Sequence, residues 1–468
     1  MGSTFFGLEI AKRGLLAQMT ALNTVSHNIV NANTQGYTKQ RVDLTATLPF
    51  SAPSYNRDMV VPGQLGTGVQ VGIINSMRNN ILDARIKEAM STQSSSSTLT
   101  DKLSELESFF NEPNTPNLGD SLNEFWNALS DVANNPESTA IRSNLLNVTQ
   151  TITGHFHYLG DRIAKIENDL NTAVSTSVKS INNLADELAN VNQQIFSSLN
   201  IGDQPNDLMD KRDLLLNDLA KITNYQATPM DNGMIKVEIN GHTLVGGNWT
   251  MKLSAQPDIA NNNFLKPVFV DDGVDALISG GSLKGDMDMR DVYLPGYKAD
   301  INAAANALIT NMNAMQQGGY ALNAAAPTGI DFFTGTDMND ININPVLDGN
   351  PALVAAAKNA SSVGDGSNAV AMSGLKDALV MAGGTLTINQ YYANIVSNIG
   401  SDSAQAKNDT GIYDTLNTQL SQLKNSASGV SLDEEMTDMI KYQHAFTANT
   451  KVVQVQDQVL QTILDLIK

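Results

Sequence analysis

The sequence contains no cysteine, and charged residues and long apolar runs are also scarce. A cytosolic chain of 468 residues usually keeps a few thiols, so the complete lack of cysteine favours a location outside the cytosol. Asp, Glu, Lys and Arg make up 16% of the residues, against about a quarter in average soluble proteins. This composition suits surfaces that pack against copies of themselves, although a secreted protein of low charge would share it. No apolar run approaches the roughly 20 residues that span a bilayer, so we expect no membrane-spanning segment.

Basic residues are in the minority among the charged ones. The chain has 29 Lys and Arg against 48 Asp and Glu, which gives a formal net charge of -19. Nucleic acids and anionic membranes bind basic patches, so we expect neither as a partner. In the first twenty residues, Glu9, Lys12 and Arg13 interrupt the apolar positions. We therefore expect no cleaved secretory signal.

The sequence also lacks the motifs that carry chemistry. It has no HExxH, GxSxG, Walker A or dinucleotide-binding pattern. Its histidines are scattered, and the closest pair, His155 and His157, would point to different faces of a helix. The acidic clusters around Asp210 and Asp286 lack the spacing of a calcium loop, and solvated faces and helix caps explain them better. We expect no catalytic, cofactor-binding or metal site, and thus no enzyme.

What the sequence does contain is a heptad pattern at each end. Apolar residues recur at alternating steps of four and three, which is typical of a helix that packs on another helix. Ser431 and Glu434 form a candidate capping box, so we predict one long C-terminal helix. Such a stripe needs a partner within the chain or on another subunit, and periodicity alone does not exclude packing on a globular core. The seam residues are Phe5, Leu8, Leu15, Met19, Leu22 and Ile29, and Leu432, Met436, Met439, Phe446, Val453, Leu460, Leu464 and Ile467.

The N-terminal helix is closed by the run SHNIVNANTQGYTKQ, residues 26–40. Its Asn and Thr side chains compete for backbone hydrogen bonds and stop the helix. This run resembles the N-terminal signature of bacterial flagellar rod, hook and hook-associated proteins. The last forty residues, which begin GVSLDEEMTDM, resemble the C-terminal signature of the same family. Within that family, the whole chain looks most like the hook-associated proteins at the junction of hook and filament.

The resemblance implies a structural assembly subunit without catalysis. The terminal helices would pair as a coiled coil, and the seam residues together with Asn31, Asn33, Gly36 and Tyr37 would form the assembly interface. The implied partners are further copies of the chain in a ring, the hook protein, a second junction protein (hook-associated protein 3), and an export chaperone near the C-terminus. The implied location is extracellular, after export from the cytoplasm by the flagellar type III apparatus without signal cleavage.

Between the two ends, the sequence changes character several times. Residues 38–74 alternate short β-like runs with turn residues, and residues 81–223 are helical, with breaks at 111–119, 134–136 and 200–205. Residues 160–199 carry a sustained helical seam. Residues 225–297 switch to period two, with hairpin signals at Asp231-Asn232-Gly233 and Asn240-Gly241.

These patterns predict an elongated, mainly α protein with an inserted small β domain. The predicted domains are a terminal coiled coil (1–40 plus 430–468), a helical bundle (41–224 plus 300–429) and an outer β-rich insertion (225–299). Two alternatives remain open. One is another axial protein, either flagellin-like or a hook protein, although a hook protein should have more β structure. The other is a secreted adhesin whose β insertion binds a ligand.

Overall fold

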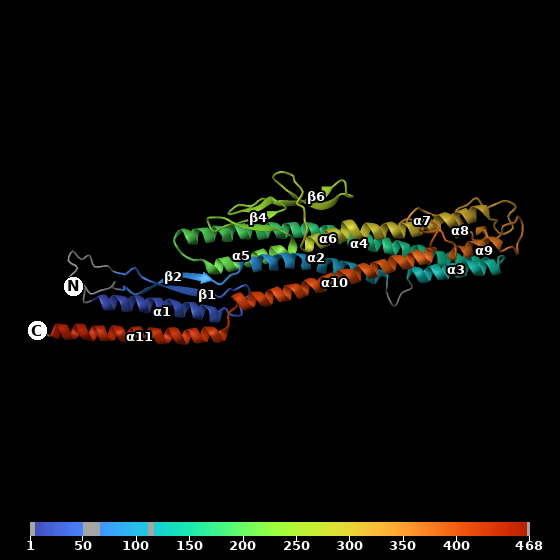
Figure 1. Ribbon diagram of the computed structural model, residues 1–468. Coiled ribbons are helices and arrows are strands. Elements are labelled where there is room, and N and C mark those ends of the chain that lie inside the picture. Colours follow the sequence, from blue (N-terminus) through green and yellow to red (C-terminus); the bar gives the residue numbers. More distant parts are fainter. Residues whose placement is uncertain (1–4, 50–65, 111–116, 466–468) are drawn as a thin grey trace.

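The computed structural model describes residues 5–49, 66–110 and 117–465. It shows an elongated, mainly helical molecule with a few small antiparallel sheets, which confirms the predicted fold class (Figure 1). The predicted seam residue Ile467 lies outside the described residues, as do residues 50–65 of the predicted extended segment. In the part of the chain that is described, no helix is long and apolar enough to cross a membrane.

The two ends of the chain come together at one extremity. Helix α1 (Phe6–Val30) lies antiparallel beside helix α11 (Leu432–Asp465), as predicted (Figure 1). Strands β1 (Gln40–Ala46) and β2 (Val69–Ser76) form an antiparallel hairpin that packs on α1. The hairpin therefore lies beside the terminal helices, whereas the predicted domain boundary at residue 41 assigned it to the bundle.

The middle of the molecule is a bundle of long helices. The predicted breaks at 134–136 and 200–205 are confirmed, because one helix ends and the next begins at each, while most of the predicted break at 111–119 lies outside the described residues. Side-chain caps mark three of the starts: Asn117 before α3, Ser138 before α4 and Thr387 before α10. The helices are α2 (Asn80–Phe110), α3 (Leu118–Asn134), α4 (Thr139–Asn200), α5 (Asn206–Ile222), α6 (Ser282–Asp288), a π-helical turn (Met289–Tyr293), α7 (Leu294–Gly318) and α10 (Ile388–Ser428).

Helix α4 is longer than the predicted seam, which started at Gly160. It has 62 residues, or about 93 Å at 1.5 Å per residue. Gly160, where the predicted seam starts, lies within the helix, and a Cβ atom there would collide with Asn339 Oδ1. The first part of α4 lies in the core of the bundle and the second part in a separate core beneath the β insertion.

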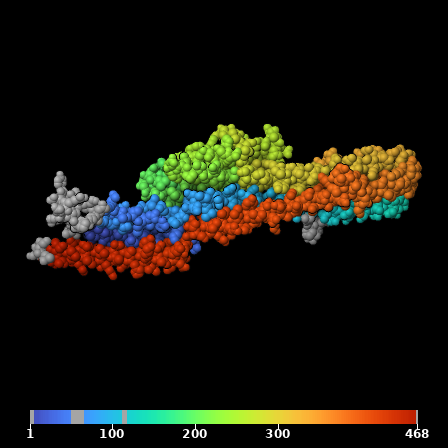
Figure 2. Space-filling view, in the orientation of Figure 1, coloured from blue at the N-terminus to red at the C-terminus, as the bar shows by residue number. Residues whose placement is uncertain are grey.

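The β insertion packs on the second half of α4. Its three-stranded sheet has the order β3 (Gln226–Pro229), β4 (Ile235–Ile239), β5 (His242–Gly246), and a hairpin of β6 (Leu253–Asp258) and β7 (Phe264–Phe269) follows. The predicted turn at Asn240-Gly241 is confirmed, since both residues have positive φ (47° and 84°). The insertion forms a bulge on one side of the rod (Figure 2).

The end opposite the termini consists of short elements: β8 (Phe333–Thr334), β9 (Asn342–Ile343), α8 (Pro345–Asp348), α9 (Ser367–Ser373) and two 3₁₀ turns (Pro351–Leu353 and Gly374–Lys376). Arg142 of α4 holds them in place. Arg142 is 1% exposed, and its guanidinium donates to the carbonyl oxygens of Pro136 and Val354. The buried Arg142 side chain therefore links α4 to these short elements through hydrogen bonds.

Asp286 gives a prediction about stability. The expectation that its acidic cluster forms a solvated face is wrong for this residue, which is buried between α6 and α2. Burial raises its pKa from 3.8 to about 6, although Lys102 and Arg290 pull it down. The folded state therefore binds the proton more tightly than the unfolded chain, and stability falls as the pH rises from about 4 to about 6. Above pH 6 the loss is about 3 kcal/mol at 1.36 kcal/mol per pKa unit.

Asp286→Asn should therefore unfold at a higher urea concentration than the parent at pH 7.5, and the difference should shrink towards pH 4. Urea titrations at both pH values measure this, with the exposed Asp169→Asn on α4 as the matched control. A variant that is less stable than the parent at pH 7.5 would contradict the assignment of a buried charge.

Candidate functional site

Helices α1 and α11 meet along a row of small residues spaced by seven. A Cβ atom on Gly7 would lie 2.9 Å from Gln456 Cδ, and one on Gly14 would lie 2.7 Å from Asn449 Oδ1. Two heptads further along α1, Asn28 Nδ2 donates to Glu435 Oε2 over 2.9 Å. Each step of seven forward on α1 thus matches steps of seven backward on α11, which defines a single antiparallel register. Small residues allow the two backbones to approach closely.

Most of the large predicted seam residues do not lie on this contact line. On α1, Phe5 and Met19 are exposed, and Leu8, Leu15, Leu22 and Ile29 are partly buried. On α11, Leu432, Met436 and Leu464 are exposed, and Met439, Phe446, Val453 and Leu460 are partly buried. The prediction that the helices pair is confirmed, but the small residues of α1 and polar residues of α11 make the closest contacts. Many of the large apolar side chains remain at the surface.

Sequence reasoning also missed a second apolar stripe on α11. Val452, Val455, Val459 and Ile463 are exposed and recur at steps of three and four, so they share one side of the helix. On α1, Leu16 is also exposed. The missed small-residue row had its own signal, because Gly7, Gly14, Ala21 and Asn28 are each seven apart. A search for large apolar residues alone passes over it.

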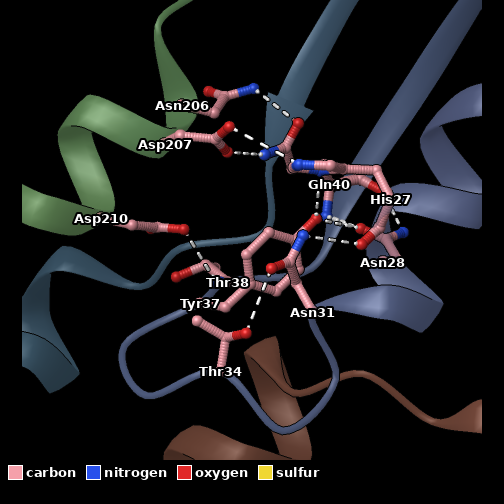
Figure 3. A network of polar contacts seen from close by, with 10 residues as sticks. All are labelled: His27, Asn28, Asn31, Thr34, Tyr37, Thr38, Gln40, Asn206, Asp207 and Asp210. Atoms are coloured by element: carbon pink, nitrogen blue, oxygen red, sulfur yellow. Dashed lines mark hydrogen bonds and ion pairs between the residues drawn. The ribbon is translucent and has the colours of Figure 1, made fainter.

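The segment after α1 forms a network of polar contacts around Asn28 (Figure 3). Asn28 is 1% exposed, and its amide nitrogen donates to Gln40 O (2.8 Å) as well as to Glu435. Its amide oxygen accepts from Tyr37 Oη (2.7 Å) and from Gln40 N (3.0 Å). All four hydrogen-bonding positions of the side chain are therefore used.

The network continues from α1 to the start of α11. Lys39 Nζ lies 3.0 Å from both Glu434 Oε2 and Glu435 Oε1, so the Glu434 carboxylate, which was predicted to cap its own helix, bonds Lys39. Glu435 is 1% exposed. Burial alone would lower the pKa of Lys39, but its hydrogen bonds to these two carboxylates raise it. A buried charge on α11 is thus matched by a cation and an amide from the segment that follows α1.

The same segment is also tied to α5. Asp210 Oδ2 accepts from Thr38 N (2.9 Å), and its other oxygen accepts from Arg78 Nη2 (2.6 Å). Asp210 is buried, and burial raises its pKa although Thr38 and Arg78 act in the other direction. The expectation that this acidic cluster is a solvated face is therefore wrong for Asp210. Gln40 Nε2 also donates to Asp207 Oδ1 of α5 over 2.8 Å. We call the whole network the polar joint: Asn28, Tyr37, Thr38, Lys39, Gln40, Arg78, Asp207, Asp210 and Glu435.

The four other predicted interface residues differ in their surroundings. Gly36 has φ +80°, and a Cβ atom there would fall 2.5 Å from Leu214 Cγ of α5, so only glycine fits. Tyr37 belongs to the polar joint. Asn31 Nδ2 donates to His27 O (3.1 Å) at the end of α1. Asn33 is exposed. Two of the four are therefore engaged in contacts between parts of the same chain.

The site offers surfaces for packing. Within the described residues, no group of three or more His, Cys, Asp or Glu side chains is placed to hold a metal ion. The features that stand out are the paired helices, their exposed aliphatic side chains and the polar joint.

Comparisons with known proteins give the same picture along the chain. Family models match residues 8–38 (flagella basal body rod protein), residues 103–333 (flagellar hook-associated protein FlgK helical domain) and residues 424–466 (flagellar basal body rod FlgEFG protein C-terminal). A solved structure, the flagellar hook junction protein FlgK from Burkholderia pseudomallei, superposes with a TM-score of 0.64 at 16% identity. The match covers 74% of this chain and 100% of that one, and it shows the shared fold.

Curated relatives match over nearly their whole length. Flagellar hook-associated protein 1 of Bacillus subtilis (strain 168) is 29% identical, over 99% of both chains. The proteins of the same name from Salmonella typhimurium and Escherichia coli are 25% and 23% identical, over 97% of this chain and 99% and 98% of theirs. Terminal signatures, helical domain and full-length relatives all agree: along nearly its whole length, the chain is similar to flagellar hook-associated protein 1.

Proposed function

We propose that this chain is the structural subunit that joins the flagellar hook to the filament, and that it assembles through the exposed apolar residues of α1 and α11. The observation that carries the proposal is the pair of terminal helices with large apolar side chains on its outside. Burying one such side chain contributes about 1.5–3 kcal/mol. Neighbouring subunits that cover these residues would gain that energy, whereas the lone chain cannot.

The exposed residues of α11 favour two different neighbours. Leu432, Met436 and Ile440 lie on one side of the helix near the bundle. The stripe that begins at Val452 lies on another side, towards the free end. Two unlike patches on different sides suit a head-to-tail contact, in which each subunit presents one patch to each neighbour, as in a ring or helical tube.

The proposed interface comprises Phe5, Leu8, Leu15, Met19, Leu22, Ile29 and Asn33 on the N-terminal side, with Leu432, Met436, Met439, Phe446, Val453, Leu460 and Leu464 on α11. It also includes the other exposed apolar residues of α11, which are Ile440, Val452, Val455, Val459 and Ile463. The proposed partners are further copies of this chain, the hook protein, hook-associated protein 3 and an export chaperone near the C-terminus. The proposed place is the flagellum outside the cell, reached through the type III apparatus. We propose three modules: the terminal helices with the β1–β2 hairpin, the helical bundle, and the β insertion.

A double substitution, Val455→Glu with Val459→Glu, tests the proposal. Both side chains are exposed in the lone chain, so the purified variant should keep the parent's circular dichroism and urea midpoint. The variant is then expressed in a strain from which the gene for this protein has been deleted. We expect hooks without filaments and flagellin in the medium, because the two new charges would be buried in the contact between subunits. Electron microscopy of the cells and immunoblots of the medium measure both effects.

The matched control is Gln454→Glu with Gln458→Glu, which adds the same two charges at exposed positions one residue earlier. It should support filaments. Normal filaments with the valine variant would sink the proposed interface. Hooks that fail to form in a strain without the protein would point to a hook protein rather than a junction protein.

A further inference from the structure

We propose that the polar joint fixes the direction in which the paired terminal helices leave the bundle, so that residues 28–40 serve to orient the assembly module. Asn28, Thr38 and Lys39 are then positioning residues rather than contacts between subunits. The inference rests on the proposed assembly role for its consequence in the flagellum. The orientation itself is a property of the lone chain.

The chain crosses between the bundle and the terminal module at two short links, and Lys39 ties both. One link, between α10 and α11, spans only residues 429–431. The backbone N–H of Lys39 donates to Ser428 O, at the end of α10, over 3.0 Å. The other link joins β2 to α2, and there Met77 N donates to Lys39 O over 2.8 Å. One residue therefore pins both crossings with its main chain while its side chain holds Glu434 and Glu435.

On the side of the terminal helices, the joint is held by a buried carboxylate and its two hydrogen-bonding partners. Glu435 is a buried carboxylate, and a buried charge is stable only while its partners stay in place. Those partners, Asn28 and Lys39, come from the end of α1 and from the segment after it. If α11 rotated away from this segment, the Glu435 carboxylate would lose its hydrogen bonds while still buried, which costs free energy. The network thus favours one arrangement of α11 over a range of them.

The bundle side is held by a second buried carboxylate. Asp210 of α5 bonds the backbone of Thr38 and the guanidinium of Arg78, and Arg78 Nη1 also lies 2.9 Å from Asp213 Oδ2. Next to this contact, Gly36 presses its backbone on Leu214 without room for a side chain. Segment 36–40 is therefore clamped between two buried anions, one on each module.

The length of the terminal helices makes the angle matter. Helix α11 has 34 residues and is about 50 Å long. A rotation of about 10° at the joint would move its far end by about 9 Å, which is close to the spacing between packed helices. Stripes on neighbouring subunits would then miss each other by a whole helix. A fixed joint lets the stripes of successive subunits meet in register.

The test measures distances across the joint in the isolated chain, and these distances report how the terminal helices are oriented relative to the bundle. Because the sequence has no cysteine, two introduced cysteines carry the only spin labels. The pair Lys211→Cys and Ala448→Cys reports across the joint, and the pair Asn23→Cys and Ala448→Cys reports within the terminal helices; all three positions are exposed. Double electron–electron resonance on the otherwise unchanged protein should give a single narrow distance distribution for each pair.

Asn28→Asp places a carboxylate against Glu435 and removes both donated hydrogen bonds. We expect the narrow distribution across the joint to be lost, while the distribution within the terminal helices stays narrow. Asp210→Ala breaks the bundle side of the joint, away from the terminal helices, and should have the same effect. The matched control Asn33→Asp makes the same chemical change at an exposed residue of the same segment and should keep both distributions.

Unchanged distances across the joint in both variants would overturn the proposal. Loss of the narrow distribution within the terminal helices in Asp210→Ala would also overturn it, because the joint would then hold the helices together instead of orienting them. These measurements stand apart from filament growth. A failed orientation test leaves the assembly interface intact, and normal filaments with Val455→Glu and Val459→Glu leave the joint intact.

Discussion

Gly14→Leu is expected to separate the paired terminal helices and to abolish filament growth. Gly14 is buried, and even a Cβ atom there would lie 2.7 Å from Asn449 Oδ1. Leucine improves the helix propensity by about 0.8 kcal/mol relative to glycine, but overpacking costs about 1–3 kcal/mol and the branched side chain pushes the helices apart. Trypsin measures the separation, since Lys12 and Arg13 lie within the first half of α1, next to Gly14. Cleavage there should become faster.

Two controls accompany this prediction. Ser26→Leu puts the same side chain at an exposed position of α1 and should leave the trypsin resistance of the parent. Gly14→Ala combined with Asn449→Ala removes the atoms that would collide and should keep the helices paired. If Gly14→Leu resists trypsin as well as the parent does, the register of α1 and α11 described above is wrong.

Arg142→Met should cause a large loss of stability at the end of the molecule opposite the termini. Burial lowers the pKa of Arg142 to about 10, so its guanidinium is still charged at neutral pH. Methionine fills much of the space but leaves the carbonyl oxygen of Pro136 without its donor, and leaves that of Val354 with only the backbone N–H of Ala356. At about 1–3 kcal/mol for the unpaired carbonyl oxygen of Pro136 and about 1.5–3 kcal/mol for the hydrogen bond to a charged group that Val354 loses, the expected loss is about 2.5–6 kcal/mol. Urea unfolding followed by circular dichroism measures it.

The matched variant is Arg142→Lys, which keeps the charge but not the planar fork of donors. It should fall between the parent and Arg142→Met. Hydrogen exchange should rise around residues 350–356, and the trypsin sites in α1 should keep their protection. A variant with the parent's urea midpoint would show that Arg142 does not organise this end.

The helix ends and the hairpin turns could be predicted because local chemistry determines them. Asn117, Ser138 and Thr387 cap helices within three residues of their own positions, and Asn240-Gly241 has the positive φ angles that few other pairs adopt. Contacts of this kind join residues that are close together in the sequence. The helix between the predicted breaks at 134–136 and 200–205 was also predicted in full, and Gly160, where the predicted seam starts, lies inside α4 in close contact with Asn339.

The polar joint could not be predicted, because its contacts join distant positions. Asn28 and Glu435 are 407 residues apart in the sequence, and Thr38 and Asp210 are 172 apart. The residue type does not show whether an aspartate is buried or exposed to solvent, so Asp210 and Asp286 were assigned to the surface. The contact face of α1 was missed for a related reason: glycine and alanine give no apolar signal, although their small size is what brings α11 close.

Helix α4 has a consequence for how the protein comes apart. Its first half is part of the bundle core and its second half part of the core under the β insertion, with no break between them. Unfolding of either core would disorder part of α4, which the other core also contains. The free energies of unfolding of the two cores are therefore coupled. The bundle and the insertion should therefore melt in one cooperative heat-absorption peak, despite their different secondary structure.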